Sequence, residues 1–499
     1  MTLHYRALPF VALLALVTGS AFSQTPCSSG SAAGYPCMNT TLLSAMTPIE
    51  LGAAPSEASL NDVWGWTDPD SGIEYALVGR RDGVSFVDIS DPLNPRVVAN
   101  LPTQTRATSW RDIKVYQNHA YVVADNALEH GMQVFDLTRL RGMSGDIQVV
   151  SPDTVYSGFA SSHNVVINED SGFAYAVGSS GGTSCAGGLH MIDISEPTNP
   201  VFVGCQTDAT IGRGYTHDAQ CVIYHGPDTE HVGKEICFNA NEAGVNIADV
   251  SDKEHPATLS FVTYPTAQYV HQGWLTEDHK YYYQDDELDE LRAGTNTKTM
   301  IWDVTDLDDP VLVKAFDQGT SNIDHNLYVR GDLLFEANYR AGMRIYDISD
   351  RENPVLVSYF DTYPSDDDPQ FSGAWSVYPY FNSGNIVING FGGFFIVRTP
   401  VLAALDHGIE PDAPGSVDVF PNPFVESATV RVRQNSTGPL RVDVHDILGR
   451  RVATLFDGAV RADETIELDL DGTNLPAGQY LIVATAPSGR VVRNMTKGN

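Results

Sequence analysis

Four histidines recur at a fixed interval and are the clearest candidates for chemistry in this sequence. They stand 54 residues apart, in a chain with only 14 histidines, and a polar residue follows each of them. Imidazole nitrogens beside carboxylates suit transition metals and charged substrates, so the set predicts a metal or ligand site. A structural alternative is that each imidazole bonds to the backbone or a polar side chain of a neighbouring repeat. The four residues are His163, His217, His271 and His325.

Further polar residues stand at equivalent positions and are expected to surround the same opening. Glu242, paired with Asp285 or Asp286, would supply the acid and the nucleophile or base of a hydrolase or lyase. Acidic residues at loop tips are usually solvated, and neither a Gly-x-Ser-x-Gly elbow nor a phosphate-binding glycine-rich loop occurs. Besides these three, the expected set comprises Asn61, Arg80, Arg81, Arg111, Asp125, Asn126, Asn338, Arg340 and Trp375.

A separate acidic loop is a candidate for calcium. Asp361 and the run 366–368 offer oxygen ligands, but they do not match the EF-hand pattern, and a solvated loop is the alternative. The expected cofactor is therefore either none or a divalent metal, calcium or a transition metal.

The elements that position these residues are repeats. YALVGRRDGVSFVDISDPLNPRVVANL (75–101) recurs four times, with an Asp-Ile-Ser core or a close variant of it, and twice more weakly. Each copy reads as three strands, and the Asp-Pro-x-Asn-Pro segment marks the hairpin between the second and third, because proline cannot sit inside a central strand. One further strand, opened by a polar pair, precedes each copy.

The second residue of that pair sets the register of the repeats. Its positions are 62, 112, 164, 218, 272, 326 and 376, which gives seven units of four strands. Such units close into a ring without exposed edges, so we predict a seven-bladed β-propeller over residues 55–401. The last unit lacks its fourth strand, and residues 41–47 (TLLSAMT) are expected to supply it and so close the ring.

All six cysteines are expected to form disulfides. Cys221 and Cys237 flank a predicted hairpin loop and should face each other across two strands. Cys27 with Cys37 is the natural local pair, which leaves Cys185 with Cys205. Zinc binding by these cysteines is disfavoured, because close Cys-x2-Cys pairs are absent from the sequence.

The amino terminus and the overall charge bear on location and partners. Residues 1–23 read as a signal peptide, with Arg6 before an apolar core and small residues at the cleavage position. No later segment reaches the roughly 20 apolar residues of a transmembrane helix. A formal charge of −33 argues against nucleic acid as a partner.

After a linker at 402–416, residues 417–499 alternate apolar and polar positions as a small immunoglobulin-like β-sandwich does. The motifs PNPF (421–424), DILGR (446–450) and LPAGQY (475–480), with Lys497 at the end, resemble the type A sorting domain of the type IX secretion system. This resemblance implies recognition by that secretion machinery, removal of the domain, and release or attachment at the outer cell surface.

The preceding repeats also resemble a known family. CSSGSAAGYPC (27–37), NDVWGWTD, YTHDAQCVIYHGP and KEICFNANE, with the Val-Asp-Ile-Ser-Asp-Pro cores, are similar to the choice-of-anchor B family built from LVIVD repeats. The resemblance implies an exported repeat domain and names no catalytic residue.

Two classes of function are compatible with these features. One is an exported binding module that recognises a glycan, a peptide or an envelope partner. The alternative is a metal-dependent or carboxylate-based extracellular hydrolase or lyase. The first is preferred, because the sequence contains polar loops around a ring but no established catalytic motif.

Overall fold

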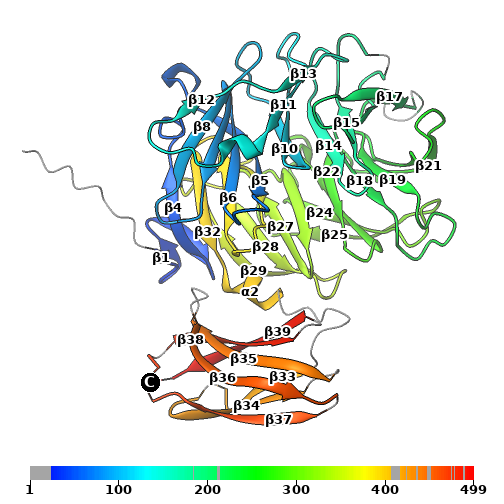
Figure 1. Ribbon diagram of the computed structural model, residues 1–499. Coiled ribbons are helices and arrows are strands. Elements are labelled where there is room, and N and C mark those ends of the chain that lie inside the picture. The colour runs from blue at the N-terminus through cyan, green and yellow to red at the C-terminus, as the bar shows by residue number, and fades with distance from the viewer. Residues whose placement is uncertain are drawn as a thin grey trace, which may run out of the picture.

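The computed structural model describes residues 24–498 except 184, 209, 211–213, 406–415, 423, 434–436, 447–450, 463, 474, 477 and 487–488. The expected signal peptide, most of the linker and most of the DILGR motif lie outside these residues. The described chain forms a ring of β-sheets and a smaller β-sandwich (Figure 1).

Seven antiparallel sheets of four main strands make up the ring and confirm the seven-bladed propeller. Blades 1 to 3, each given from the centre outward, are β5 (Leu60–Thr67), β6 (Glu74–Arg80), β7 (Gly83–Asp88) and β8 (Arg96–Pro102); β9 (Arg111–Tyr116), β10 (His119–Ala124), β11 (Met132–Asp136) and β13 (Thr154–Tyr156); and β14 (Asn164–Asn168), β15 (Phe173–Val177), β16 (Leu189–Asp193) and β17 (Val201–Gln206).

The remaining blades follow the same order. Blades 4 to 7 are β18 (Asp218–Ile223), β19 (Glu235–Ala240), β20 (Val245–Asp249) and β21 (Ala257–Val262); β22 (Val270–Leu275), β23 (Tyr281–Asp286), β24 (Lys298–Asp303) and β25 (Val311–Asp317); β26 (Asn326–Arg330), β27 (Leu333–Ala337), β28 (Met343–Asp347) and β29 (Val355–Phe360); and β30 (Ala374–Tyr378), β31 (Ile386–Gly390), β32 (Gly393–Arg398) and β4 (Thr41–Met46).

The ring closes where the two ends of the propeller sequence meet. Each innermost strand lies against the innermost strand of the next blade, and β30 of the last blade lies against β5 of the first. The amino-terminal strand β4 pairs with β32 and so supplies the outer strand of blade 7. Leu43 of β4 is buried in one apolar cluster with Phe394 of blade 7 and Leu60 of blade 1. Closure therefore depends on side-chain burial as well as on the strand ladder.

Short additional strands extend three of the blades. The amino-terminal segment adds β3 (Tyr35–Met38) and β2 (Ser31–Ala32) to the edge of blade 6 and β1 (Thr25–Pro26) to the edge of blade 7. The Cys27–Cys37 disulfide lies within this segment. Blade 1 gains β12 (Gln148–Val149). The short helices are η1 (Pro55–Glu57), η2 (Leu137–Leu140), α1 (Asp289–Ala293) and α2 (Pro400–Leu405).

A recurring turn explains the Asp-x-Ser pattern of the repeats. In six blades the aspartate that ends the third strand accepts a hydrogen bond from the backbone N–H two residues later, at 2.8–3.0 Å. Such Asx turns satisfy backbone groups that leave the ladder. The six aspartates are Asp88, Asp136, Asp193, Asp249, Asp303 and Asp347.

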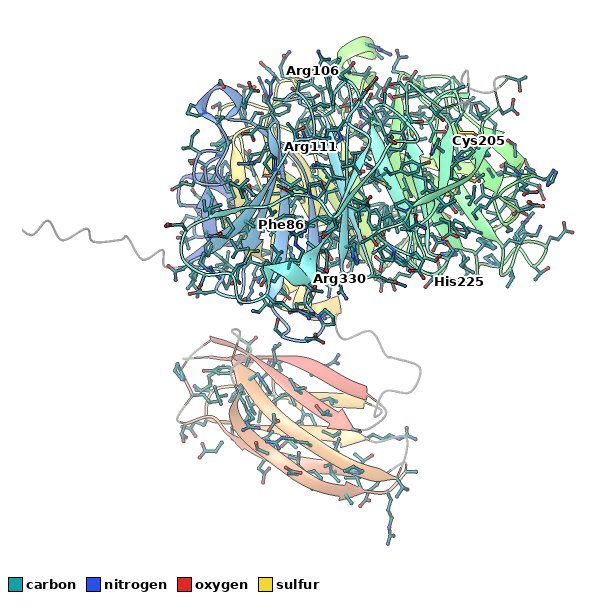
Figure 2. The ribbon with its side chains drawn as sticks, turned by 45° about the horizontal axis from the view of Figure 1, so that its top comes forward. Phe86, Arg106, Arg111, Cys205, His225 and Arg330 are labelled. Atoms are coloured by element: carbon teal, nitrogen blue, oxygen red, sulfur yellow. A yellow bond between two sulfur atoms is a disulfide. The ribbon has the colours of Figure 1, made fainter. Side chains whose placement is uncertain are left out.

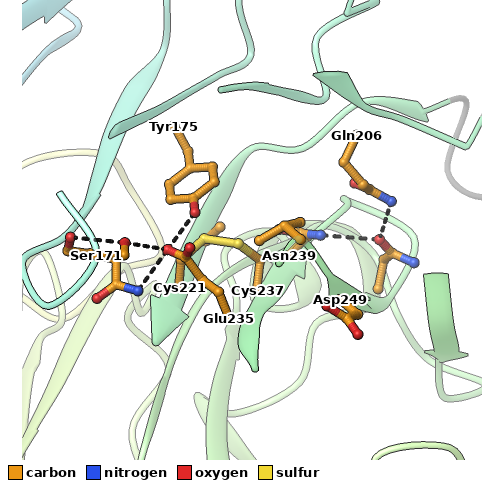
Figure 3. The surroundings of a disulfide bond; sticks show 12 residues. Ser171, Tyr175, Gln206, Cys221, Glu235, Cys237, Asn239 and Asp249 are labelled. Atoms are coloured by element: carbon orange, nitrogen blue, oxygen red, sulfur yellow. Dashed lines mark hydrogen bonds between the residues drawn. A yellow bond between two sulfur atoms is a disulfide. The ribbon is translucent and has the colours of Figure 1, made fainter. Parts of the chain in front are cut away.

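Buried polar groups join blades 3 and 4 (Figure 3). The Glu235 carboxylate accepts hydrogen bonds from Tyr175 Oη at 2.5 Å and Ser171 Oγ at 2.6 Å in blade 3, and from Lys253 Nζ at 2.6 Å in blade 4. Beside it, the Cys221–Cys237 disulfide joins directly opposed residues of β18 and β19. The third disulfide, Cys185–Cys205, lies in blade 3. All six cysteines are therefore bonded, in the expected pairs.

The carboxyl-terminal body is a two-sheet sandwich. One sheet has the order β33 (Ser416–Phe420), β34 (Ser427–Arg433) and β37 (Thr465–Asp471). The other has the order β36 (Arg451–Val460), β35 (Gly438–Asp446), β38 (Gly478–Ala486) and β39 (Gly489–Lys497). Val430, Val442, Ile482 and Met495 are fully buried between the sheets. The expected linker differs at its start, because α2 extends to Leu405.

Candidate functional site

The four histidines stack side by side across the mouth of the central channel. The distance between ring centroids is 4.2 Å for His163 and His217, 4.2 Å for His217 and His271, and 4.4 Å for His271 and His325. Trp375 continues the row at 4.8 Å from His325. One register of four successive blades therefore forms a continuous aromatic arc, which we call the histidine stack.

Two hydrogen bonds within the histidine stack link neighbouring blades. His217 Nδ1 lies 3.1 Å from the carbonyl oxygen of His271, and His325 Nδ1 lies 2.5 Å from that of Trp375. Burial lowers the pKa of His217 and His271 well below the ordinary value, and that of His325 to about 3. These three imidazoles are neutral near pH 7, and each ring that donates through Nδ1 keeps Nε2 as an acceptor or ligand. These bonds favour the structural role predicted as the alternative.

The polar residue after each entry position also joins blades. Asn164 Nδ2 donates to the carbonyl oxygen of His217 at 3.1 Å, and Asn326 Nδ2 donates to that of Trp375 at 3.2 Å. Asp112 Oδ2 accepts from Val165 N–H at 2.7 Å. The entry residue and the polar residue that follows it in each repeat thus mainly form hydrogen bonds between neighbouring blades.

Below the histidine stack, one buried ammonium group sits among carboxylates. Lys114 Nζ lies 2.6 Å from Asp112 Oδ1 and 3.8 Å from Asp62 Oδ2. Burial raises the pKa of Asp62 well above its usual range, despite the opposing effect of Lys114. Burial likewise raises the pKa of Asp218 to about 7. Although burial opposes it, the neighbouring Lys114 lowers the pKa of Asp112, so the single lysine is paired chiefly with one of the three carboxylates.

The channel is too narrow for an organic ligand. The cavity lined by the histidine stack and by Asp62, Asp112, Lys114 and Asp218 has a volume of about 10 Å³. This volume is roughly that needed by one water molecule. The polar residues of the channel can therefore hold a water or a single ion, and a larger ligand must bind elsewhere.

Several residues expected in loops are instead buried parts of strands. Asp285 and Asp286 end β23 and are 1% and 0% exposed, which corrects their expected position at a loop tip. Asp286 accepts hydrogen bonds from Tyr264 Oη at 2.6 Å and from the N–H groups of Gln268 and Tyr269 at 2.7 Å. Because both its oxygens are used, Asp286 is a structural acceptor.

Two predicted arginines and Asn338 are also interior. Arg80 ends β6 rather than lying in a loop, and it donates to the carbonyl oxygen of Leu51 at 3.3 Å. Arg111 donates from Nε to the carbonyl oxygen of Arg80 at 3.0 Å, and burial lowers its pKa to about 10. Asn338 Nδ2 donates to Glu336 Oε2 at 2.9 Å. The structure brings these residues to the inside of the ring, where a ligand outside cannot reach them.

Arg81, Glu242 and Arg340 lie on the rim. Arg81 Nε is 3.1 Å from Glu57 Oε2. Glu242 is half-buried and has a positive φ of 56°. Arg340 pairs with Asp366 of the predicted calcium loop and donates to Ser372 Oγ at 2.9 Å. An arginine therefore already neutralises one carboxylate of that loop.

An open groove lies beside the histidine stack, on the face where the innermost strands begin (the entry face). Its volume is about 670 Å³, and it is lined by Thr105, Arg106, Asn126, Leu128, Glu129, Ala160, Ser161 and Ser180. We call it the entry-face groove. It borders the stack through Asp125, whose Oδ2 lies 3.0 Å from His163 Nδ1. Figure 2 shows Arg106 at the edge of the ring opposite to Arg330 and His225.

Three blades contribute to the floor and walls of this groove. Arg106 precedes β9, and its Nε donates to the carbonyl oxygen of Asn126 at 2.8 Å, which fixes one loop against the next. Leu128 has a positive φ of 60° and is 62% exposed. Ser161 and Ser180 form an isolated β-bridge. The groove is therefore built of mutually bonded loops and presents an exposed apolar side chain between polar ones.

Apart from Asn126, which was expected at the channel face, sequence reasoning missed the residues of this groove and several in the channel. Arg106 and Leu128 lie in loops whose packing depends on three blades at once, so no local pattern marks them. Lys114 could have been found, because it stands two positions after Asp112 and strand alternation directs both inward. Glu287 directly follows the Asp285–Asp286 pair, but its approach to the histidines depends on the chain path after β23.

Within the described residues, no helix is long and apolar enough to cross a bilayer. Residues 418–497 match the family model of the secretion system C-terminal sorting domain, and residues 184–208 and 325–362 match that of the LVIVD repeat. The sorting domain indicates export by the type IX secretion system. The protein is secreted or displayed at the cell surface, and its three disulfides agree with that location.

None of the curated proteins matches the chain. Among solved structures, it is similar to a chain of "COPII on membranes, outer coat vertex", with TM-score 0.48 and 11% identity over 88% of this chain and 99% of that chain. It is also similar to the extracellular domain of a putative hybrid two-component system from B. thetaiotaomicron, with TM-score 0.44 and 10% identity over 92% of this chain and 59% of that chain. Similarities of this size carry no argument about function. The chain thus combines LVIVD repeats in a β-propeller with a type IX sorting domain.

Proposed function

We propose that this chain is an extracellular binding module of the choice-of-anchor B type, which holds a peptide segment of a partner protein in the entry-face groove. The observation that carries the proposal is the groove itself. Its volume of about 670 Å³ lies within the range of about 300–1,000 Å³ that ligand sites occupy. The central channel, with about 10 Å³, offers no comparable room.

The lining favours a peptide over a glycan. Arg106 and Glu129 provide opposite charges, Asn126 provides an amide, and the exposed Leu128 provides an apolar contact. Peptides present the same mixture of charged, polar and aliphatic groups. Glycan sites commonly stack sugar rings on aromatic side chains, and none of the described residues that line the groove is aromatic.

Several loops hold the groove in one shape before a ligand arrives. Thr105 Oγ1 donates to the carbonyl oxygen of Ala127, and Thr108 Oγ1 donates to that of Asp125 at 2.8 Å. These bonds fix the loop before β9 against the loop after β10. Pre-organised loops reduce the conformational entropy that binding would otherwise cost, which favours recognition of an extended segment.

A selection from a displayed peptide library tests the proposal. The purified full chain, immobilised through its carboxyl terminus, should enrich peptides that share a consensus. The groove variant Arg106→Glu/Leu128→Asp should lose at least about tenfold in affinity for them. The matched control is Val232→Asp/Lys280→Glu, which changes an exposed apolar residue and an exposed lysine away from the groove. Equal loss in both variants, or no loss in either, would overturn the proposal.

A further inference from the structure

We propose that the channel mouth binds one divalent transition-metal ion of the zinc type through His271, Glu287 and His325. Each residue offers one ligand atom, and the three atoms lie within 4.8 Å of one another. His325 Nε2 and Glu287 Oε1 are 3.7 Å apart. Two ligands of a tetrahedral zinc ion, each about 2.1 Å from the metal, are separated by roughly 3.4 Å, so small side-chain adjustments suffice.

The hydrogen bonds around His325 and Glu287 fit a metal site. His325 uses Nδ1 for the carbonyl oxygen of Trp375, which leaves Nε2 directed at Glu287. Tyr339 Oη donates to Glu287 Oε1 at 2.9 Å. Metal-bound histidines characteristically use their second nitrogen for a carbonyl or carboxylate, and ligating carboxylates are themselves hydrogen-bonded. The outer partners of such a site are therefore already in place.

The third member, His271, has an unsatisfied nitrogen. His271 is 2% exposed, and its buried Nδ1 forms no hydrogen bond, lying 3.4 Å from Asp285 Oδ1. One oxygen of Asp285, Oδ2, is also buried without a partner. Buried polar atoms are rarely left unpaired, and a cation bound to His271 would account for its nitrogen. Asp285 is not one of the three grouped ligands, so its carboxylate is a neighbour that orients the His271 ring.

The chemistry of the three ligands favours a transition-metal ion over calcium. Two imidazoles and a carboxylate are borderline ligands that suit zinc and related ions, whereas calcium prefers oxygen ligands throughout. This inference does not depend on the entry-face groove, since neither Arg106 nor Leu128 belongs to the set.

The described residues contain a second group of possible metal ligands, and any zinc-binding test must distinguish it from the proposed site. Asp228, His231 and Asp308 also have ligand atoms within 4.8 Å, but the Asp308 side chain is 55% exposed. Asp228 Oδ2 already accepts a hydrogen bond from Leu307 N–H at 3.0 Å. Asp308→Asn removes a ligand of this group and leaves the channel mouth unchanged.

Isothermal titration calorimetry, in which zinc is added to the chelator-treated full chain, tests the proposal. The wild type should bind one zinc ion, and Glu287→Gln and His325→Gln should each weaken binding at least tenfold. His163→Gln alters the same histidine stack outside the proposed ligand set, and it should bind zinc as the wild type does, as should Asp308→Asn. Zinc should also raise the melting temperature of the wild type but not that of Glu287→Gln.

Two results would overturn the proposal. The first is a wild type that binds no zinc. The second is a zinc affinity that Asp308→Asn abolishes or that Glu287→Gln leaves unchanged. Glu287→Gln is the decisive variant if His325→Gln fails to fold, because it keeps the size of a half-buried side chain. The visible spectrum of cobalt bound in place of zinc then provides an independent readout of histidine ligation.

Discussion

Replacing Glu235 by glutamine should weaken the propeller strongly, because this carboxylate is the centre of the bonds between blades 3 and 4. Glu235 is 5% exposed and accepts hydrogen bonds from Asn168, Ser171, Tyr175 and Lys253 at 2.5–2.7 Å. The amide of glutamine fills the same space but leaves the Lys253 ammonium, whose side chain is 10% exposed, without its counter-ion. Breaking a buried ion pair in this way costs about 3–5 kcal/mol.

Urea unfolding followed by tryptophan fluorescence measures this loss in the full chain. All six tryptophans lie in the propeller sequence between 64 and 375, so the signal is independent of the sandwich. Glu254→Gln is the matched control, because Glu254 is an exposed glutamate in the turn after β20. It should change the free energy of unfolding by less than about 0.5 kcal/mol.

A double-mutant cycle makes the prediction specific to the ion pair. Lys253→Met removes the ammonium that Glu235→Gln would leave unpaired, so the double variant should be more stable than the sum of the single losses implies, by at least about 1 kcal/mol. The reasoning is refuted if Glu235→Gln unfolds within about 0.5 kcal/mol of the wild type, or if the two losses are additive.

Two further predictions concern closure and pH. Leu43→Ala in β4 should lower the free energy of unfolding by about 2–5 kcal/mol in the same urea assay, because Leu43 is 3% exposed. The control Ile49→Ala, at a residue that is 50% exposed, should leave the free energy of unfolding nearly unchanged. Equal effects of the two substitutions would refute closure of the ring by β4. Burial raises the pKa of Asp218 to about 7, above its unfolded value, so its contribution to stability is complete below about pH 4 and is lost as the pH rises through about 7. Between about pH 5 and 7, the free energy of unfolding should therefore fall by on the order of 1 kcal/mol less in Asp218→Asn than in the wild type. Free energies of unfolding that change with pH in parallel in the two proteins would contradict this.

Most of the propeller could be predicted from the sequence, because short segments of each repeat mark where its strands and turns lie. The Asp-x-Ser turns and the prolines fix one hairpin in each blade, so the register from Asp62 to Ser376 follows from spacing alone. The position of β4 also follows, because a blade that lacks an outer strand leaves an edge that another segment must cover.

The functional face could not be predicted in the same way. Asp285 and Asp286 resemble loop residues in sequence, yet β23 carries them into the interior, where their hydrogen-bond donors come from other segments. The entry-face groove depends on how loops from three blades pack, and its key side chains, Arg106 and Leu128, belong to no repeated position. The histidine spacing is visible in the sequence, but no sequence pattern marks Glu287 as the residue that completes the group with His271 and His325.

Hydrogen–deuterium exchange of the full chain with a selected peptide tests the central claim most directly. Exchange should become slower on binding in the loops that form the entry-face groove, at 103–110, 125–131 and 157–163, and should be unchanged in the hairpin loops at the opposite face, such as 276–281. Protection confined to that opposite face, or to the outer strands of the blades, would contradict the assignment of the groove as the binding site.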